Sequence, residues 1–156
     1  MIDRENFERL APLAYEWALA QEQFILRLGF PLRPAAVADA VRAGVQEPER
    51  VRVLVVDRIP LPANEELAEA SRLSGIITDA SGGVAIGFGI MIRADHWGDR
   101  ELLLHQLVHV AQCERAGGLQ RFVAEYLSDR QTAPGFTVGT IEEEARRTAR
   151  EICAEG

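Results

Sequence analysis

Hydrophobic positions near the start of the chain repeat with a helical period. Between residues 7 and 28, apolar side chains recur at three- and four-residue steps, which is the spacing of an amphipathic helix. Pro12 predicts a break or a kink early in this segment, because proline lacks the backbone N–H that a helix needs. Gly29 and Pro31 predict its end. The first element is therefore expected to be one amphipathic helix.

Three shorter elements are expected before residue 75. A helix over 34–43 begins with proline, which suits a first turn, and is followed by glycine, which suits a stop. The run 51–56 is rich in β-branched residues and bounded by prolines, so it predicts a strand. Asn64 is a suitable N-cap for a helix that continues to about Leu73.

The pattern then changes to one typical of β-structure. Residues 75–93 predict a hairpin, or two neighbouring strands, with a turn at 79–83. Gly87 and Gly89 fall inside the second predicted strand, where the missing side chains permit a bulge, a turn or the close approach of another element.

Three helices are expected in the remaining chain. Asp99 is a good N-cap for a helix that is apolar on nearly every side and stops at Gly117. A second helix follows from residue 119, and a capping box of Thr140 and Glu143 predicts the start of a third. The order helix, strand, helix, strands and then helices indicates the α+β class.

Length, composition and charge predict the number of domains, the kinds of partner and the compartment. A chain of 156 residues with 47% hydrophobic residues is long enough for one core and short for two, so a single domain is expected. The net charge of −7 and the absence of lysine argue against nucleic acid or an anionic membrane as partner. No apolar stretch of export or membrane length follows the N-terminus, which favours the cytoplasm. Cys113 and Cys153 are then expected to be reduced thiols.

The strongest chemical signal lies in the predicted apolar helix that begins after Asp99. His105 and His109 are four residues apart, so their side chains project only roughly 40° apart around the helix axis and can reach one metal ion. The segment is the HExxH arrangement with Gln106 in place of glutamate. Two histidines that hydrogen-bond inside the core would be the alternative, but a pair at ligand spacing favours metal.

A catalytic type of zinc site needs a third protein ligand. Cys113 lies about 12 Å along the helix from His105, too far for one shared ion. His96, in the preceding loop, is a weak alternative. The glutamates 142–144 offer a better one, and Glu142 points closest to the apolar face of its helix. Acidic residues also favour helix N-termini without any metal, which is the competing explanation for this cluster.

Several of these segments together resemble a known family. The strand 87–93, the helix 102–112 (LLLHQLVHVAQ) and the segment 141–145 (IEEEA) resemble compact gluzincin metallopeptidase-like domains over roughly residues 75–150. In that group, a downstream helix supplies a glutamate three residues before a small residue. The resemblance implies His105, His109 and Glu142 as ligands of one zinc ion per chain.

The same resemblance implies a fold and a substrate site. Together with the single domain expected from length, it predicts one zincin-like domain over residues 1–156, with a short sheet packed on the metal-binding helix in 75–156. Residues 1–74, with helices and a strand, match no known family. The strand before the zinc helix would align a peptide or protein substrate through main-chain hydrogen bonds, which assigns substrate binding to Gly89, Ile90 and Met91. An ordinary core strand is the alternative for this segment. Apart from the resemblance, Tyr126, His96 or Arg93 could stabilise a developing charge near the metal, and an ordinary packing or surface role is the alternative for each.

Gln106 departs from the family pattern at the position of the general base. A glutamine amide has nearly the shape of a glutamate but cannot accept the proton that the base removes. The prediction is therefore a zinc-dependent metallopeptidase-like protein that is catalytically impaired, either a natural pseudoenzyme or a peptidase silenced by an introduced glutamine. The alternative is a noncatalytic zinc-binding module that binds a partner protein.

Overall fold

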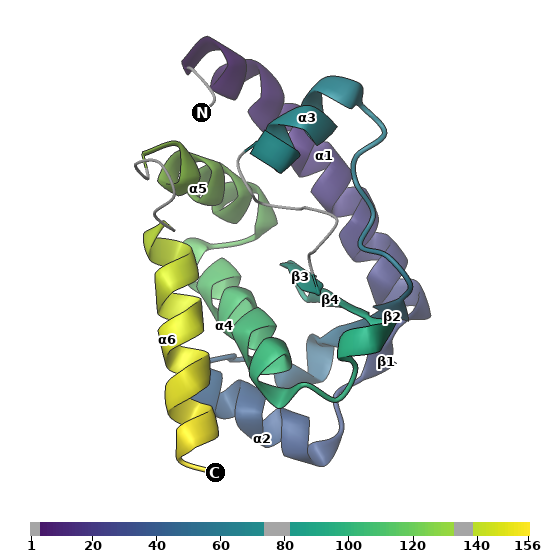
Figure 1. Cartoon of the computed structure of the whole chain (residues 1–156), viewed down its shortest axis with the longest axis vertical. Helices are drawn as coiled ribbons and strands as arrows, with labels where there is room; N and C mark the ends of the chain where they lie inside the picture. Colours follow the sequence, from purple (N-terminus) through teal and green to yellow (C-terminus); the bar gives the residue numbers. More distant parts are fainter. Residues whose placement is uncertain (1–3, 74–81, 133–138) are drawn as a thin grey trace.

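The computed structural model describes residues 4–73, 82–132 and 139–156 (Figure 1). In chain order, the elements are α1 (Arg4–Leu28), β1 (Phe30–Pro31), α2 (Pro34–Ala43), a 3-10 turn (Pro48–Arg50), β2 (Arg52–Val56), α3 (Glu65–Leu73), β3 (Gly83–Ile86), β4 (Gly89–Arg93), a 3-10 turn (Ala94–His96), α4 (Arg100–Ala116), α5 (Leu119–Thr132) and α6 (Thr140–Ala154). This arrangement confirms the α+β class. The boundaries of α2, α3 and α4 agree closely with the sequence prediction.

One small mixed sheet joins the first and second halves of the chain. Its strand order is β1-β2-β4-β3. The central strands β2 and β4 are parallel, with Val53 opposite Ile90, and the other two pairs are antiparallel. Among the described residues, β3 therefore forms one edge of the sheet and β4 is paired on both sides. The predicted N-terminal part and the predicted metal-binding core thus contribute strands to the same sheet.

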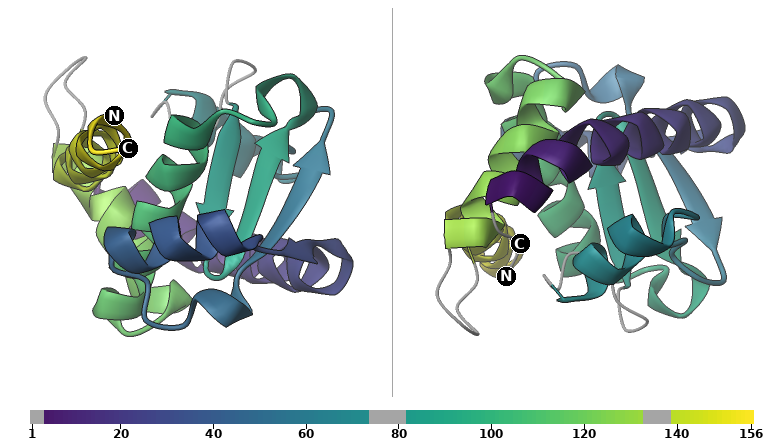
Figure 2. Two further views of the ribbon diagram at one scale, coloured as in Figure 1. Left: turned by 90° about the horizontal axis from the view of Figure 1, so that it is seen from below. Right: turned by 90° about the horizontal axis from the view of Figure 1, so that it is seen from above.

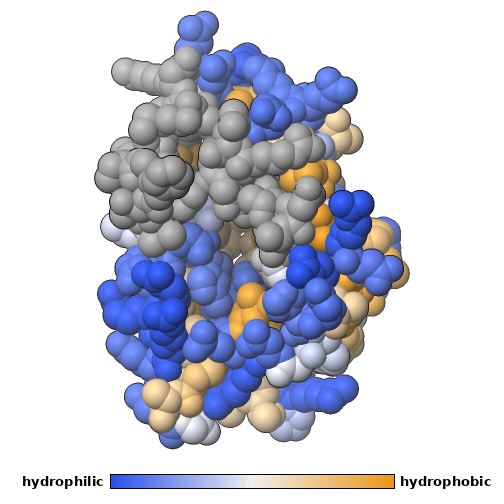
Figure 3. All heavy atoms as spheres, viewed as in Figure 1, coloured by the Kyte–Doolittle hydropathy of each residue, from blue (hydrophilic) through white to orange (hydrophobic). Residues whose placement is uncertain are grey.

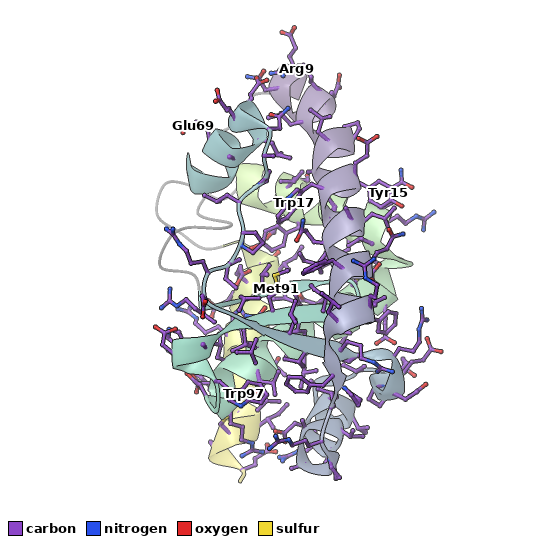
Figure 4. The ribbon with its side chains drawn as sticks, turned by 90° about the vertical axis from the view of Figure 1, so that its right-hand side faces the viewer. Arg9, Tyr15, Trp17, Glu69, Met91 and Trp97 are labelled. Atoms are coloured by element: carbon purple, nitrogen blue, oxygen red, sulfur yellow. The ribbon has the colours of Figure 1, made fainter. Side chains whose placement is uncertain are left out.

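Helices cover both faces of this sheet (Figure 2). Side chains of a strand alternate between the two faces, and β4 shows the consequence. Ile90 and Ile92 pack in the larger core with α2, α4 and α6, whereas Met91 packs with Ile25 on the face that α1 covers. Figure 4 shows α1 crossing that face, with Trp17 on the helix and Met91 on the sheet. The helix predicted to carry the metal ligands therefore lies between the sheet and α6.

Helix α4 is the most buried helix among the described residues, and its ends follow from local sequence. The Asp99 carboxylate accepts a hydrogen bond from the Leu102 N–H at 3.1 Å, which satisfies one of the free donors of the first turn. Gly117 ends the helix with φ 96°, a left-handed conformation that glycine adopts without steric cost. Both features confirm the predicted start and stop of this helix.

The predicted break at Pro12 is wrong, because α1 is one continuous helix of 25 residues. Proline removes one hydrogen bond to the carbonyl of the residue four positions earlier. Here that residue is Glu8, and both Glu8 and Pro12 are exposed at the surface, where the loss of one helix hydrogen bond is tolerated.

The second strand predicted in this region is itself a hairpin. The turn lies at Gly87, where φ is 62°, and so the single strand predicted there is in fact β3 and β4. Gly89 begins β4 against helix α1: a Cβ on this residue would lie 2.9 Å from the Cβ of Ile25. The predicted turn at 79–83 lies largely outside the described residues. The two glycines thus serve the turn and the close helix packing that the sequence allowed.

The capping box predicted for α6 is also wrong. Thr140 is the first residue of the helix, and the side chain that caps it comes from α5. The Asp129 carboxylate accepts hydrogen bonds from the Thr140 N–H and hydroxyl at 3.1 and 2.6 Å and from the Ile141 N–H at 3.2 Å. Glu143 instead pairs with Arg146, one turn further on. A cap supplied by another helix has no local sequence signature.

A half-buried ion pair fixes α2 to the start of α4. Both Asp39 oxygens accept hydrogen bonds from the Arg100 guanidinium at 2.9 Å. These hydrogen bonds hold the pKa of Asp39 below its ordinary value, outweighing burial, and the charges of Arg100 and Arg42 act in the same direction. Asp39 therefore contributes stability that is present above its unfolded-state pKa of about 3.9 and lost as the pH falls through the lower folded-state value.

We expect Asp39→Asn to lower the free energy of unfolding by about 1–3 kcal/mol at pH 7, the range for a hydrogen bond to a charged group. Because the wild-type carboxylate protonates in acid, the difference should shrink as the pH falls below about 3.9. Urea unfolding at several pH values measures it. Asp95→Asn is the matched control, since that aspartate also pairs with an arginine but is 64% exposed; a loss as large as that of Asp39→Asn would contradict the prediction.

No helix among the described residues is long and apolar enough to cross a membrane. The outer face of α6 is predominantly hydrophilic (Figure 3), in agreement with its sequence pattern.

Candidate metal centre

Helices α4 and α6 bring three metal-binding side chains to one point. His105 and His109 project from the same face of α4, with ring centroids 4.9 Å apart, and Glu142 faces them from the first turn of α6. The Glu142 carboxylate lies 2.9 Å from His105 Nε2 and 3.1 Å from His109 Nε2. One donor atom from each residue lies within 4.8 Å of the others, which is a separation that a single ion can bridge. The three ligands expected from sequence are thus brought together.

Small residues allow the two helices to approach closely enough for this site. Ala145 and Ala149 on α6 are fully buried against α4. They continue the face of α6 that carries Glu142, and so the packing of the helices places that carboxylate over the histidines. Glu144 and Glu143 are more exposed, at 39% and 42%, against 23% for Glu142. The order predicted from helical periodicity is confirmed.

The donor set is partly open to solvent. The His109 side chain is 8% exposed, while those of His105 and Glu142 are each 23% exposed. Two imidazole nitrogens and one carboxylate oxygen are ligands that zinc accepts in sites that keep a further position for water or substrate. The residues present therefore fit zinc by donor chemistry, by number and by access.

Tyr126 on α5 contacts the same carboxylate. Its hydroxyl donates a hydrogen bond to Glu142 Oε1 at 2.5 Å. Burial opposes ionisation of Glu142, but its contacts with His105, His109 and Tyr126 outweigh burial and hold its pKa far below the ordinary range. The carboxylate is therefore ionised and ready to act as a ligand. Tyr126 thus lies beside the candidate site, and its hydroxyl is directed to the Glu142 carboxylate. Its predicted role in stabilising charge stays a prediction.

Gln112, which the sequence analysis did not single out, completes the surroundings of His109. Gln112 Oε1 lies 2.7 Å from His109 Nδ1, on the side of the ring away from Glu142. The amide nitrogen of Gln112 donates to the Ile141 carbonyl at 3.0 Å and to Glu144 Oε1 at 2.8 Å. The spacing of Gln112, three residues after His109 on a helix, was the available signal for such a contact.

Gln106 lies on the side of α4 that faces the sheet. Its side chain is buried, with 5% exposure. A Cβ on Gly83 in the edge strand β3 would lie 3.3 Å from the Gln106 amide nitrogen. The residue at the predicted general-base position is therefore enclosed between α4 and the edge of the sheet.

The substrate role predicted for this strand is wrong, and the alternative, an ordinary core strand, is confirmed. Gly89, Ile90 and Met91 are buried in β4, which is hydrogen-bonded to β2 on one side and β3 on the other. Its main-chain groups are therefore used within the sheet, and a peptide cannot add to it. The reason is that the turn at Gly87 inserts β3 between β4 and the edge. If any strand aligns a peptide, it is β3 (Gly83–Ile86).

Two other candidate ligands lie outside the group. His96 Nε2 is 3.1 Å from the Arg93 guanidinium, so His96 and Arg93 pair with each other in the segment before α4. Cys113 is buried, and burial, together with the charges of Glu22 and Glu114, raises the pKa of its thiol to about 12. A thiol of that pKa is a poor metal ligand at neutral pH. Among the described residues, the group that could hold a metal ion comprises the two histidines and Glu142.

Comparison with protein-family models, with curated proteins and with solved structures finds no significant match for this chain. The chemistry of the site therefore has to be inferred from its own residues.

Proposed function

We propose that the chain binds one zinc ion through His105, His109 and Glu142 and is a zinc-dependent metallopeptidase-like protein. Its substrate would be a peptide or protein, and its hydrolytic activity would be impaired by Gln106. The observation that carries this proposal is that donor atoms of the three residues lie within 4.8 Å of one another. They come from two different helices, and His109 and Glu142 are 33 residues apart in the sequence. Three protein ligands are typical of catalytic zinc, whereas structural zinc sites usually have four.

Zinc in such a site polarises a carbonyl group and lowers the pKa of water. The residues around it would supply the remaining steps. His105 and Glu142 leave one side of the site accessible to substrate, and the Tyr126 hydroxyl holds the Glu142 carboxylate in place. The Gln106 amide can donate or accept a hydrogen bond and so can orient water, but it cannot take up a proton. Proton transfer is thus the step missing from this constellation.

The edge strand β3 is the best candidate for holding an extended peptide. It is antiparallel to β4, and among the described residues its other side has no strand partner. An extended peptide can add to such an edge through main-chain hydrogen bonds. Since Gln106 borders Gly83 in this strand, a peptide added there would pass close to the helix that carries the histidines.

A noncatalytic zinc-binding module that binds a partner protein is the second candidate. Gln106 is the observation that favours it, since the site lacks a proton acceptor at this position. The two candidates share the zinc site and differ in what one substitution at residue 106 should do. The free thiols of Cys113 and Cys153 fit a reducing compartment for either candidate, and we place the protein in the cytoplasm.

The first test is the metal content of the untreated protein. We expect about one zinc ion per chain. A ligand that binds only the folded state stabilises it by about 2.7 kcal/mol at one hundred times its dissociation constant, so chelation should lower the melting temperature and added zinc should restore it. Elemental analysis and thermal unfolding measure both. Protein purified without metal, whose melting temperature is unchanged by zinc and by chelator, would refute the proposed site.

A further inference from the structure

Gln112 forms the middle of a hydrogen-bonded chain behind the proposed zinc site. Its side chain is buried on α4 and contacts His109 through oxygen and Ile141 and Glu144 through nitrogen. At the far end, Arg115 donates to Glu144 Oε1 at 2.6 Å. The chain thus runs from the surface of α4 and α6 to the imidazole of His109.

The orientation of the Gln112 amide follows from the chemistry of its partners. The carbonyl oxygen of Ile141 can only accept a hydrogen bond. The Glu144 carboxylate is also an acceptor, and its Oε1 atom already accepts a hydrogen bond from the Arg115 guanidinium at 2.6 Å. The NH₂ group must therefore face these two oxygens, which leaves the amide oxygen facing His109.

This orientation fixes the tautomer of His109. An amide oxygen can only accept, so His109 Nδ1 must carry the proton that lies in the 2.7 Å contact. In the neutral imidazole, Nε2 then carries the lone pair. That lone pair points at Glu142 Oε1, 3.1 Å away, which is itself an acceptor. Two acceptors at this distance repel each other unless a proton or a cation lies between them.

We infer that Gln112 is a positioning residue that presents His109 Nε2 to a metal ion, and that Glu144 in turn positions Gln112. The inference rests on the proposed zinc site and adds the residues that prepare it. A histidine ligand normally donates its other ring N–H to an outer partner, which fixes the ring and strengthens the donor, and loss of that partner costs about 10–100-fold in metal affinity. Here the outer partner is a neutral amide held by a carboxylate.

The test compares the full-length wild-type chain with Gln112→Met, which keeps the bulk of the side chain and removes the acceptor. Nitrogen-15 NMR of the histidines, recorded without metal at a pH where they are neutral, reports which ring nitrogen carries the proton. We expect the proton of His109 on Nδ1 in the wild type and loss of this preference in the variant. Zinc affinity, measured by competition with a chelator, should fall by about 10–100-fold.

Two further variants separate positioning from a general loss of stability. Cys113→Ala removes a neighbouring buried side chain of α4 that lies outside the hydrogen-bonded chain, and it should leave zinc affinity unchanged. The paired exchange Gln112→Glu with Glu144→Gln keeps an acceptor oxygen at His109 and a donor-acceptor contact between positions 112 and 144. It gives up the hydrogen bond to the Ile141 carbonyl, because a carboxylate has no donor, so it should recover part of the affinity that Gln112→Met loses.

Two results would overturn the inference: a wild-type His109 with its proton on Nε2, or a zinc affinity in Gln112→Met equal to that of the wild type. A chain that binds no zinc would instead refute the proposed function. In that case the tautomer measurement, which needs no metal, still reports whether Gln112 holds His109. The failures of the two proposals are therefore distinguishable.

Discussion

Replacing Gln106 by glutamate is expected to create or restore metal-dependent peptide hydrolysis, with a rate increase of about 10²–10⁴-fold, the usual contribution of a general base. The substitution hardly changes the volume of the side chain, so the enclosed space beside Gly83 can hold it. Gln106 is 5% exposed. Burial raises the pKa of a carboxyl group, which would move that of the introduced group toward the value at which a base works near neutral pH.

The measurement compares the present chain with Gln106→Glu on a broad peptide library, with and without chelator, after equal zinc content has been established. Gln106→Glu in a His109→Ala background is the matched control, because it carries the new carboxyl group without a complete metal site. New products that chelator abolishes would support the peptidase. Equal zinc in both chains and no cleavage of any peptide would favour the noncatalytic binding module.

Glu142→Ala is expected to weaken zinc binding far more than the same change at its neighbour Glu143, although both are in the first turn of α6. Glu142 is one of three proposed ligands. Its removal should therefore lower zinc affinity by more than roughly 100-fold, the upper value for losing a residue that only hydrogen-bonds a ligand. Glu143 pairs with Arg146 at the surface, and an exposed pair of this kind is worth at most about 1 kcal/mol, or about fivefold.

Chelator competition with the purified variants ranks them. Glu144→Ala should fall between the other two, since Glu144 contacts Gln112 and lies outside the donor group. His105→Ala and His109→Ala should resemble Glu142→Ala. If Glu143→Ala were the most damaging change, the carboxylate that faces the histidines in solution would differ from the one assigned to the site.

The ends of α4 and the placing of side chains on its faces could be predicted from the sequence, because each depends only on neighbouring residues. The cap at Asp99 and the stop at Gly117 define α4 by short-range hydrogen bonds and backbone conformation. The spacing of His105 and His109 places them on one helix face whatever the helix packs against. Periodicity even ranked Glu142 ahead of its neighbours, because the apolar stripe of α6 determines which side turns inward.

Errors arose where a distant element changed the outcome. Asp129 caps α6 from another helix, and no pattern around Thr140 indicates it. The turn at Gly87 makes β4 a central strand, which removed Gly89, Ile90 and Met91 from any substrate role. Strand order depends on hydrogen bonds between β2 and β4, which are far apart in the sequence. The pattern of apolar and polar residues within either strand does not predict this pairing.

The sequence by itself determined which helix carries the histidine pair, which glutamate turns toward the core, and that the residue at position 106 cannot accept a proton. Only the tertiary structure decided that α4 and α6 pack closely enough for the three donors to meet, and that Gln112 closes a hydrogen-bonded chain behind His109. The physical reason is the distance along the sequence between the residues that interact. Periodicity and capping act within a few residues, whereas the packing of Ala145 and Ala149 against α4 joins segments more than 30 residues apart.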